Sequence, residues 1–318
     1  MKKKDGAYTG GVIAVKETKL LKDRLPRFCA MGAEEAFRAL LDAGFGGGDA
    51  ESVSDVEKLV SADDRDIDRF ILEYAPSEEI LSYLLASRDF YNAKAIVKAD
   101  FLKTDCAPMA AGDGLFSVEA LQKKIGADDL GDMPQELAAA VRNAKSALAE
   151  GADGASVGAI FARAEAAFFN RTLKRGACRK LFALRTDMTN LLTAFRSKST
   201  EEAEKYLLEG GSLSKKQLAL AFGDAEKIKK AFRGTVYSDF ADMLVAAKEE
   251  GRPYSEAEKA LASCELRYFN EKPFELGDDG VFLRYIFRRR TENANVRIVF
   301  TSLAAGLKEG EILRRLRG

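Results

Sequence analysis

Apolar residues recur at three- and four-residue steps along most of the chain, which places them on one face of an α-helix. No stretch shows the period-two alternation of apolar and polar residues that a half-buried strand requires. The clearest segment, 282–316, predicts a long helix, a break that contains Gly306, and a short closing helix. The sequence therefore predicts an all-α fold. Further helices are expected at 12–21, 25–45, 49–74, 79–100, 157–168, 225–234, 237–250, 255–270 and from 278 to the C terminus, with another that opens at Asp132-Met133-Pro134.

Glycine and proline mark the breaks between these helices. The run Gly44 to Gly48 has the composition of a phosphate-binding loop, but no Lys-Ser/Thr pair follows it and no strand precedes it. We therefore interpret this run as the end of a helix. Loops or joints are also expected at Ala107 to Gly114, at Gly251-Arg252-Pro253 and at Glu271-Lys272-Pro273.

A short motif occurs three times within these helical runs: an acidic residue, two further residues and an asparagine. The three copies are Asp89 to Asn92, Asp187 to Asn190, and Glu292 to Asn295. Each is followed by a glycine, an apolar residue and a short helical segment, which begin at Gly114, Gly211 and Gly306. A repeat as long as roughly a third of the chain indicates a triplicated domain rather than a solenoid. We predict three helical repeat domains at 1–125, 126–224 and 225–318.

The second and third copies resemble each other more than either resembles the first. Both have an upstream segment with the pattern Glu-x-x-aromatic-Phe-Asn, at 165–170 and at 265–270. Aromatic residues that recur at equivalent positions of a repeat are expected to belong to its core. We therefore predict at least partial burial of Phe168, Phe169, Tyr268 and Phe269.

The composition narrows the possible functions. The 50 basic and 50 acidic residues balance, which argues against nucleic-acid binding because such proteins usually carry a basic excess. The absence of histidine removes Ser-His and Cys-His nucleophile pairs and histidine-ligated zinc. The four cysteines form no C-x-x-C pair and are interpreted as isolated thiols. We expect no signal peptide and no membrane-spanning helix, and hence a soluble cytosolic protein.

The acidic residues of the repeated motif have two possible roles. Three carboxylates that converged on one axis could bind a cation. Alternatively, Asp89, Asp187 and Glu292, together with Asn92, Asn190 and Asn295, are buried structural groups that bond a neighbouring loop. We favour the structural interpretation, and we expect the three asparagines to lie at equivalent positions and to be hydrogen-bonded within the protein.

Arginines accompany each copy of the motif and concentrate on the last long helix. Either they are a solvated face with ion pairs to nearby acids, or they form a docking surface for an acidic partner. The candidate partner-binding residues are Arg88, Arg185, Arg284, Arg288, Arg289 and Arg290.

Several segments together resemble a known family. They are the N-terminal helix from Tyr8 to Leu21, which ends in Lys-Leu-Leu, and the Phe45-Gly46 ending of the next long segment. The most specific is 292–298, Glu-Asn-Ala-Asn-Val-Arg-Ile, followed by Ala-Ala-Gly-Leu and a terminal Glu-x-Ile/Leu-x-x-Leu pattern. Over essentially its whole length the chain resembles the C subunits of the archaeal and bacterial V-type (A-type) ATPases, which are related to the d subunits of the eukaryotic vacuolar enzymes.

This resemblance implies a fold of three similar helical domains around a pseudo-threefold axis, with the outline of a funnel. It implies a non-catalytic rotor protein without a cofactor, whose partners are the central shaft and the membrane proteolipid ring. Such a protein lies peripherally on the cytoplasmic face of the membrane and couples the two partners during ATP-linked proton or sodium transport. Some of the candidate arginines would then face an axial cavity that receives the shaft.

Two other interpretations stay open from the residues alone. The chain is a helical scaffold of another assembly, or it is an enzyme with an unrecognised carboxylate metal site.

Overall fold

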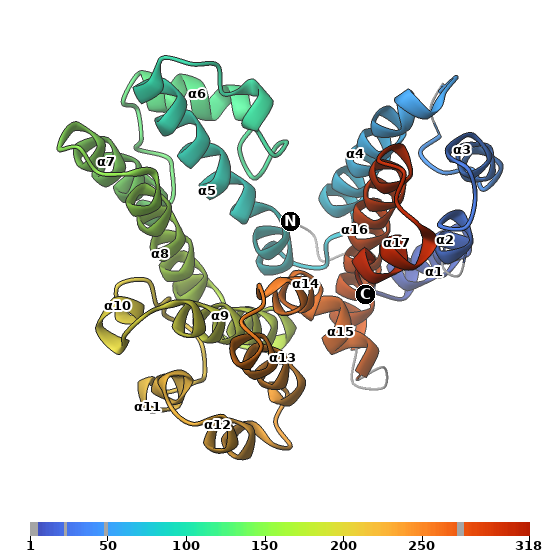
Figure 1. Ribbon diagram of the computed structural model, residues 1–318. Helices are drawn as coiled ribbons and strands as arrows, with labels where there is room; N and C mark the ends of the chain where they lie inside the picture. Colours follow the sequence, from blue (N-terminus) through green and yellow to red (C-terminus); the bar gives the residue numbers. More distant parts are fainter. Residues whose placement is uncertain (1–5, 22–23, 48–49, 272–276) are drawn as a thin grey trace. The chain divides into compact units, whose positions relative to one another are not determined.

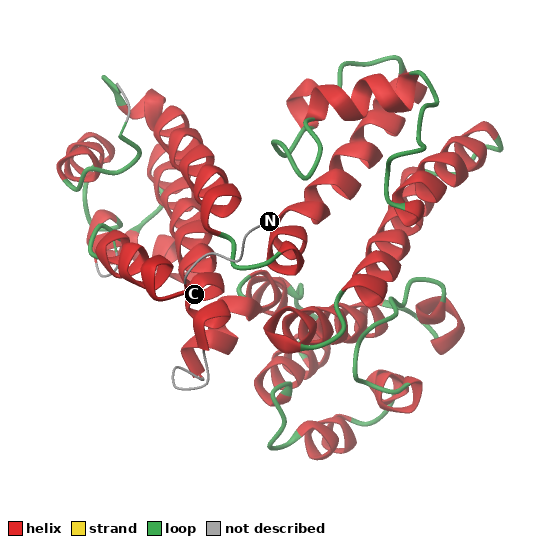
Figure 2. Cartoon of the chain, turned by 180° about the vertical axis from the view of Figure 1, so that it is seen from behind, coloured by secondary structure: helices red, strands yellow, loops and turns green. Residues whose placement is uncertain are grey.

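The computed structural model describes residues 6–21, 24–47, 50–271 and 277–318, and within these ranges the regular structure is entirely helical. Figures 1 and 2 show helices joined by loops, with no strand in the described part of the chain. The predicted all-α fold class is confirmed. Among the described helices, none has both the length and the apolar character that crossing a membrane requires.

The chain divides into two compact units, and the division falls within the helix α5. Unit 1 consists of Met1–Ile80 together with Ser255–Gly318, and unit 2 consists of Leu81–Tyr254. The three repeat domains at 1–125, 126–224 and 225–318 stay a prediction, because this division follows contacts and not internal similarity.

Unit 1 combines helices from both ends of the sequence. From the first part it contains α1 (Gly6–Glu17), α2 (Arg24–Phe28), α3 (Ala33–Asp42), the 3₁₀ turn η1 (Val53–Asp55) and α4 (Val56–Tyr74). From the last part it contains α14 (Ser255–Ala262), α15 (Cys264–Glu271), α16 (Gly277–Ala304) and α17 (Glu309–Arg315). The long helix, the break and the closing helix predicted for 282–316 correspond to α16, the turn at 305–308 and α17.

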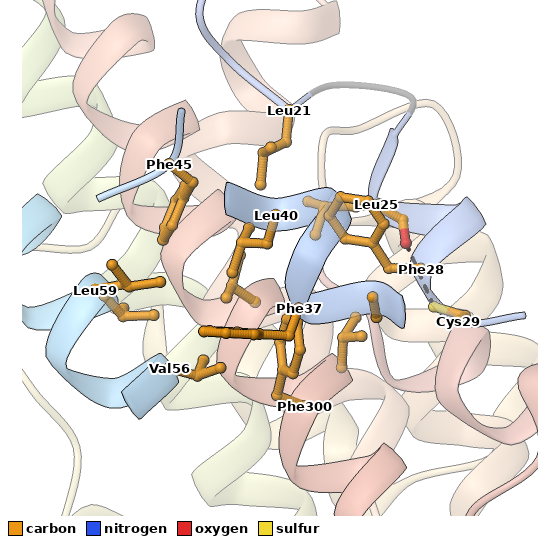
Figure 3. Packing of buried hydrophobic residues seen from close by; sticks show 14 of the residues in the cluster. Leu21, Leu25, Phe28, Cys29, Phe37, Leu40, Phe45, Val56, Leu59 and Phe300 are labelled. Atoms are coloured by element: carbon orange, nitrogen blue, oxygen red, sulfur yellow. Dashed lines mark hydrogen bonds between the residues drawn. The ribbon is translucent and has the colours of Figure 1, made fainter. Parts of the chain in front are cut away.

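The helix α16 is the centre of unit 1. It packs against α1, α2, α3, α4, α15 and α17. Its buried residues, among them Phe282, Leu283, Asn295 and Val299, are distributed around its circumference, as expected of a helix covered on several sides. In Figure 3, Phe37 of α3 and Phe300 of α16 lie together in one apolar cluster, which α2 and α4 complete with Phe28 and Leu59.

Unit 2 is built on three long helices. Its elements are α5 (Glu78–Leu102, whose first turn belongs to unit 1), η2 (Ala107–Met109), α6 (Val118–Gly126), α7 (Gln135–Ala149), α8 (Gly154–Thr172), α9 (Gly176–Arg196), α10 (Thr200–Glu204), α11 (Lys215–Leu218), η3 (Ala219–Phe222), α12 (Ala225–Phe232) and α13 (Ser238–Glu249). The helices α7 and α8 pack against each other, and Gly151, with a φ of +88°, lies in the turn between them. The helix α9 packs against α10, α11, η3 and α13.

Several predicted helix boundaries were wrong. The segment 25–45 forms two helices, α2 and α3, with a break that contains Gly32, and 255–270 divides into α14 and α15 at Ser263. The helix expected from residue 49 begins at Val56, because the Ser52 and Asp55 side chains form a capping box that starts η1. Gly44 and Gly46 have φ values of +72° and +76° beyond the end of α3, as a helix stop requires. The expected positions at 48–49 and 272–273 lie outside the described residues.

The predicted thiols and core aromatics are confirmed. All four cysteines are free and buried. Phe168, Phe169 and Phe269 are buried, and Tyr268 is partly exposed. The rings of Phe168 and Phe169 also contact each other edge to face, with centroids 5.3 Å apart.

Truncation of one repeat aromatic should destabilise the protein strongly. Phe269 is 1% exposed, so Phe269→Ala should lower the free energy of unfolding by about 3–5 kcal/mol through lost burial and a residual cavity. The matched control is Phe101→Ala, because Phe101 is 54% exposed and its truncation should cost less than about 1 kcal/mol. Chemical denaturation measures both. Equal losses would show that the assignment of Phe269 to the core is wrong.

Candidate functional site

The first acid–asparagine pair fixes the loop that follows α5. Asp89 and Asn92 lie one turn apart on α5 and are 2% and 1% exposed. The Asn92 amide donates to the carbonyl of Gly112 at 2.8 Å and accepts the Ala111 N–H at 2.9 Å. The Asp89 carboxylate accepts the N–H groups of Leu115 and Phe116 at 3.0 and 3.1 Å. Both buried side chains therefore supply hydrogen-bond partners to loop backbone groups that have none in a helix or strand.

The second pair repeats this arrangement on α9 with two additional donors. Asn190 exchanges two hydrogen bonds of 2.8 Å with the backbone of Leu208. Asp187 accepts the N–H groups of Ser212 and Leu213, each at 2.9 Å. It also accepts the hydroxyls of Ser212 and Tyr237, each at 2.6 Å. Burial, and then the Asp187 carboxylate, raise the pKa of the Tyr237 hydroxyl.

The third pair keeps the role of the asparagine and changes that of the acid. Asn295 donates to the carbonyl of Arg317 at 2.8 Å and accepts the Arg317 N–H at 2.7 Å. Glu292 instead accepts the N–H of Leu21, from the segment between α1 and α2, at 2.6 Å. All three asparagines are thus hydrogen-bonded to backbone within the protein, as we predicted. The acid at the third position joins segments that are far apart in the sequence.

The glycine that follows each motif has a physical reason. A Cβ atom at Gly114 or Gly211 would overlap the carboxylate of Asp89 or Asp187, respectively, so the close approach of loop and carboxylate requires glycine there. Gly306 differs, because a Cβ atom there would meet no neighbour within 4 Å. Its φ of +70° explains the residue instead, since this is the left-handed conformation that commonly ends a helix.

Three of the candidate arginines form ion pairs inside unit 1. Arg289 is 6% exposed, and its guanidinium contacts the carboxylates of Asp63 and Asp66 on α4, the second at 2.9 Å. Arg284 and Arg288 lie 3.8 and 3.1 Å from Glu17, the last residue of α1. The acids in these contacts come from α1 and α4. These arginines join α16 to α1 and α4.

A further arginine on α16 extends this set of ion pairs. Arg297 lies 2.7 Å from Glu57 and 2.9 Å from Asp64, both on α4. The hydrogen bond from Arg297 lowers the pKa of Glu57, despite partial burial. Asn293, one turn before Arg297, donates to Asp64 at 2.7 Å. Opposite charges on facing helices therefore set the register between α4 and α16.

The other three candidates have different surroundings. Arg88, on α5, donates to the carbonyl of Asp113 at 3.0 Å. Arg185 is exposed on α9, and its charge acts on the half-buried Glu165 of α8. Arg290 is partly exposed on α16. The structure therefore places Arg88 and Arg185 in unit 2 and Arg290 in unit 1.

Sequence reasoning missed the partners of these arginines. Glu17, Asp63 and Asp66 were not among the candidate residues, although the run Ala-Asp-Asp-Arg-Asp-Ile-Asp at 62–68 is the most acidic part of α4. Its complementarity to the basic run at 288–290 is a signal that predicts the contact between α4 and α16. Sequence reasoning also missed Glu165, which joins two helices of unit 2. Its carboxylate on α8 accepts a hydrogen bond from the Ser87 hydroxyl of α5 at 2.6 Å. Burial raises the pKa of Glu165.

The metal interpretation can be compared with this geometry. The described residues contain no group of three or more cysteine, aspartate or glutamate side chains arranged to hold a metal ion. The oxygens of Asp89 and Asp187 accept hydrogen bonds from N–H and O–H groups instead.

Comparison with known proteins now adds to this geometry. Residues 10–315 match the model of the family described as ATP synthase (C/AC39) subunit. The chain belongs to this family. The resemblance to the C and d subunits of V/A-type ATPases is thereby confirmed, and the family links the chain to ATP synthesis and ion transport. A search among curated proteins found no match.

In this member of the C/AC39 family, Asp89 should make stability depend on pH between about 4 and 6. Burial raises its pKa from 3.8 to about 6, the neighbouring Asp113 adds to the rise, and the two backbone N–H groups and Arg88 oppose it. The native state then holds this proton at pH values where the unfolded chain has released it. Its contribution is therefore fully present below pH 3.8 and is lost as the pH rises through 6.

The experiment compares the wild type with Asp89→Asn by chemical denaturation across this range. The free energy of unfolding of the wild type, minus that of the variant, should fall as the pH rises from about 4 to about 6.5, because only the wild type has this titration. If the difference in the free energy of unfolding stayed constant with pH, it would contradict the raised pKa of Asp89.

Proposed function

We propose that this chain is the non-catalytic rotor protein that links the central shaft of a V/A-type ATPase to its membrane proteolipid ring. The observation that carries the proposal is the extent of the family match, which runs from residue 10 to residue 315 and so includes both compact units. The protein would lie peripherally on the cytoplasmic face of the membrane. It would transmit torque during ATP-linked transport of protons or sodium ions.

The contacts within unit 1 support a mechanical role. A part that carries torque must resist sliding of its helices past one another. The ion pairs of Arg289 and Arg297 with α4, and of Arg288 with Glu17 of α1, oppose such sliding in addition to the apolar core. Paired and partly buried charges of this kind fix one register more than they add stability.

The hydrogen bonds within unit 2 support the same role. The loops after α5 and α9 are each fixed by one asparagine and one aspartate at the buried face of a long helix. Loops whose backbone groups are bonded to buried side chains in this way keep one defined shape and move little. Partner surfaces formed by such loops would be presented in one conformation.

The arginines divide into two groups under this proposal. Arg284, Arg288 and Arg289 neutralise acids of their own unit. We propose Arg88, Arg185 and Arg290 as contacts for the shaft, since each keeps some exposed surface and an acidic or carbonyl-rich helix end is complementary to arginine. Arg185 is the best to test because it is the most exposed of the three.

The first test is purification of the intact membrane complex through an affinity tag on this chain. Wild-type protein should retain the catalytic, shaft and proteolipid subunits. Arg185→Glu should lose the shaft at lower salt than the wild type does, because charge reversal replaces an attraction by a repulsion. The control is Arg142→Glu, which reverses an exposed charge on α7 and should retain the shaft normally.

The two arms of this test have separate meanings. A tagged wild-type chain that retains none of the ATPase proteins would overturn the proposed function. Retention of the shaft by Arg185→Glu at the salt concentration that the wild type tolerates would overturn only the assignment of Arg185.

A second test separates a rotor component from a stationary one. All four native cysteines are buried, so Met109→Cys provides a single exposed thiol at a position that is 42% exposed. A photoactivated cross-linker on this thiol should leave ATP hydrolysis intact where it captures the shaft or the ring, because these rotate together. Capture of a stationary component should stop hydrolysis. The rotor assignment would be excluded if capture of the shaft or the ring stopped hydrolysis and capture of a stationary component left it intact.

A further inference from the structure

Unit 1 contains a pocket whose walls include Arg289 and its partners Asp63 and Asp66. Its volume is about 460 Å³, and its walls come from α1 and the segment that follows it, the loop after α3, α4 and α16. A pocket of this size falls within the range of about 300–1,000 Å³ that small-molecule sites occupy. Charged side chains dominate its walls, with four cations and three acids.

The three acids of the pocket already have internal donors. Asp63 and Asp66 accept from Arg289, and Asp66 also lies 3.5 Å from the Lys16 ammonium. Glu292 accepts the N–H of Leu21. The three acids therefore already have hydrogen-bond donors, and two of the four cations, Lys16 and Arg289, are paired with acids.

The other two cations have a different situation. Lys19 follows α1, and Arg69 lies on α4, one turn beyond Asp66. Both are exposed, and neither has an ion pair or a side-chain hydrogen bond within the part of the chain that the structure describes. Two cations from different segments at one pocket repel each other, and a bound anion would relieve this repulsion.

The loop after α3 leaves the mouth of the pocket open. Three of its residues that line the pocket, Gly44, Gly46 and Gly47, have no side chain to fill it. Gly46 is required by its neighbours, because its φ is +76° and a Cβ atom there would overlap the backbone of Leu59 on α4. A Cβ atom at Gly44 or Gly47 would meet nothing within 4 Å, which shows open space beside both residues.

We propose that this pocket binds a small oligophosphate, whose negative charge Lys19 and Arg69 neutralise. A guanidinium and an ammonium from different walls match the several charged oxygens of linked phosphates, and the volume exceeds the needs of a single phosphate. The described walls include no exposed aromatic ring on which a base would stack, since Phe45 is 8% and Tyr285 1% exposed. The phosphate chain, free or as part of a nucleotide, is therefore the recognised group.

Calorimetric titration of the full chain with sodium pyrophosphate at low ionic strength tests the proposal. The wild type should bind, and the double variant Lys19→Gln with Arg69→Gln should bind at least about tenfold more weakly, since both charge-assisted contacts are lost. Both residues are exposed, so circular dichroism and thermal unfolding of the variant should match the wild type. The control variant, Arg27→Gln with Arg38→Gln, removes two exposed charges of the same unit outside the pocket and should bind as the wild type does.

Titrations with ATP and with adenosine identify the recognised group. ATP should bind in competition with pyrophosphate, and adenosine should not bind. The proposal is overturned if pyrophosphate does not bind the wild type, if the control variant loses as much affinity as the pocket variant, or if adenosine binds as well as ATP.

Discussion

A buried carboxylate or amide must have hydrogen-bond partners, and this constraint organises the chain around its long helices. Asp89, Asp187 and the three motif asparagines are almost fully buried. Leaving such a group unpaired costs about 1–3 kcal/mol, and more when it is charged. The loops after α5 and α9 return to these helices because their backbone N–H and carbonyl groups supply the missing partners. The repeated motif therefore determines the point on the long helix to which the loop returns. The glycine that follows allows the loop backbone to approach this point closely.

The same constraint acts between helices in unit 1, where the groups are charged. Arg289 is buried, so it is tolerated only with a nearby anion, and Asp63 and Asp66 supply two. Burial lowers the pKa of the guanidinium, but the charge of Asp63 and the hydrogen bonds to both carboxylates outweigh this effect and raise it. Because these partners come from α4, any shift of α4 along α16 would separate a buried charge from its counterion. A rotor component requires this kind of resistance to shear, which connects the ion pairs to the proposed function.

The sequence predicted what depends on local pattern and missed what depends on distant partners. The helical class, the long helix at 282–316 and the hydrogen-bonded asparagines follow from periodicity and from the cost of burying an amide. The divisions at Gly32 and Ser263 did not follow, because apolar spacing continues across both breaks and tertiary packing decides between one helix and two. Glu292 was expected to resemble Asp89 and Asp187, but its longer side chain bonds Leu21, which is 271 positions away. No local signal in a single sequence reveals such a contact.

The third copy of the motif also bears on the order of folding. Unit 2 is one continuous segment, 81–254, whereas unit 1 needs both Met1–Ile80 and Ser255–Gly318. Within one turn of α16, Glu292 holds Leu21 and Asn295 holds Arg317, so this turn joins segments near both ends of the chain. During synthesis the helices α1 to α4 therefore lack the central helix of their core until α16 has been made. Unit 2 meets no such delay, because all of its described elements precede α14. Closing unit 1 also carries a large loop-closure entropy, which grows only slowly with loop length, and the ion pairs and apolar core around α16 offset it.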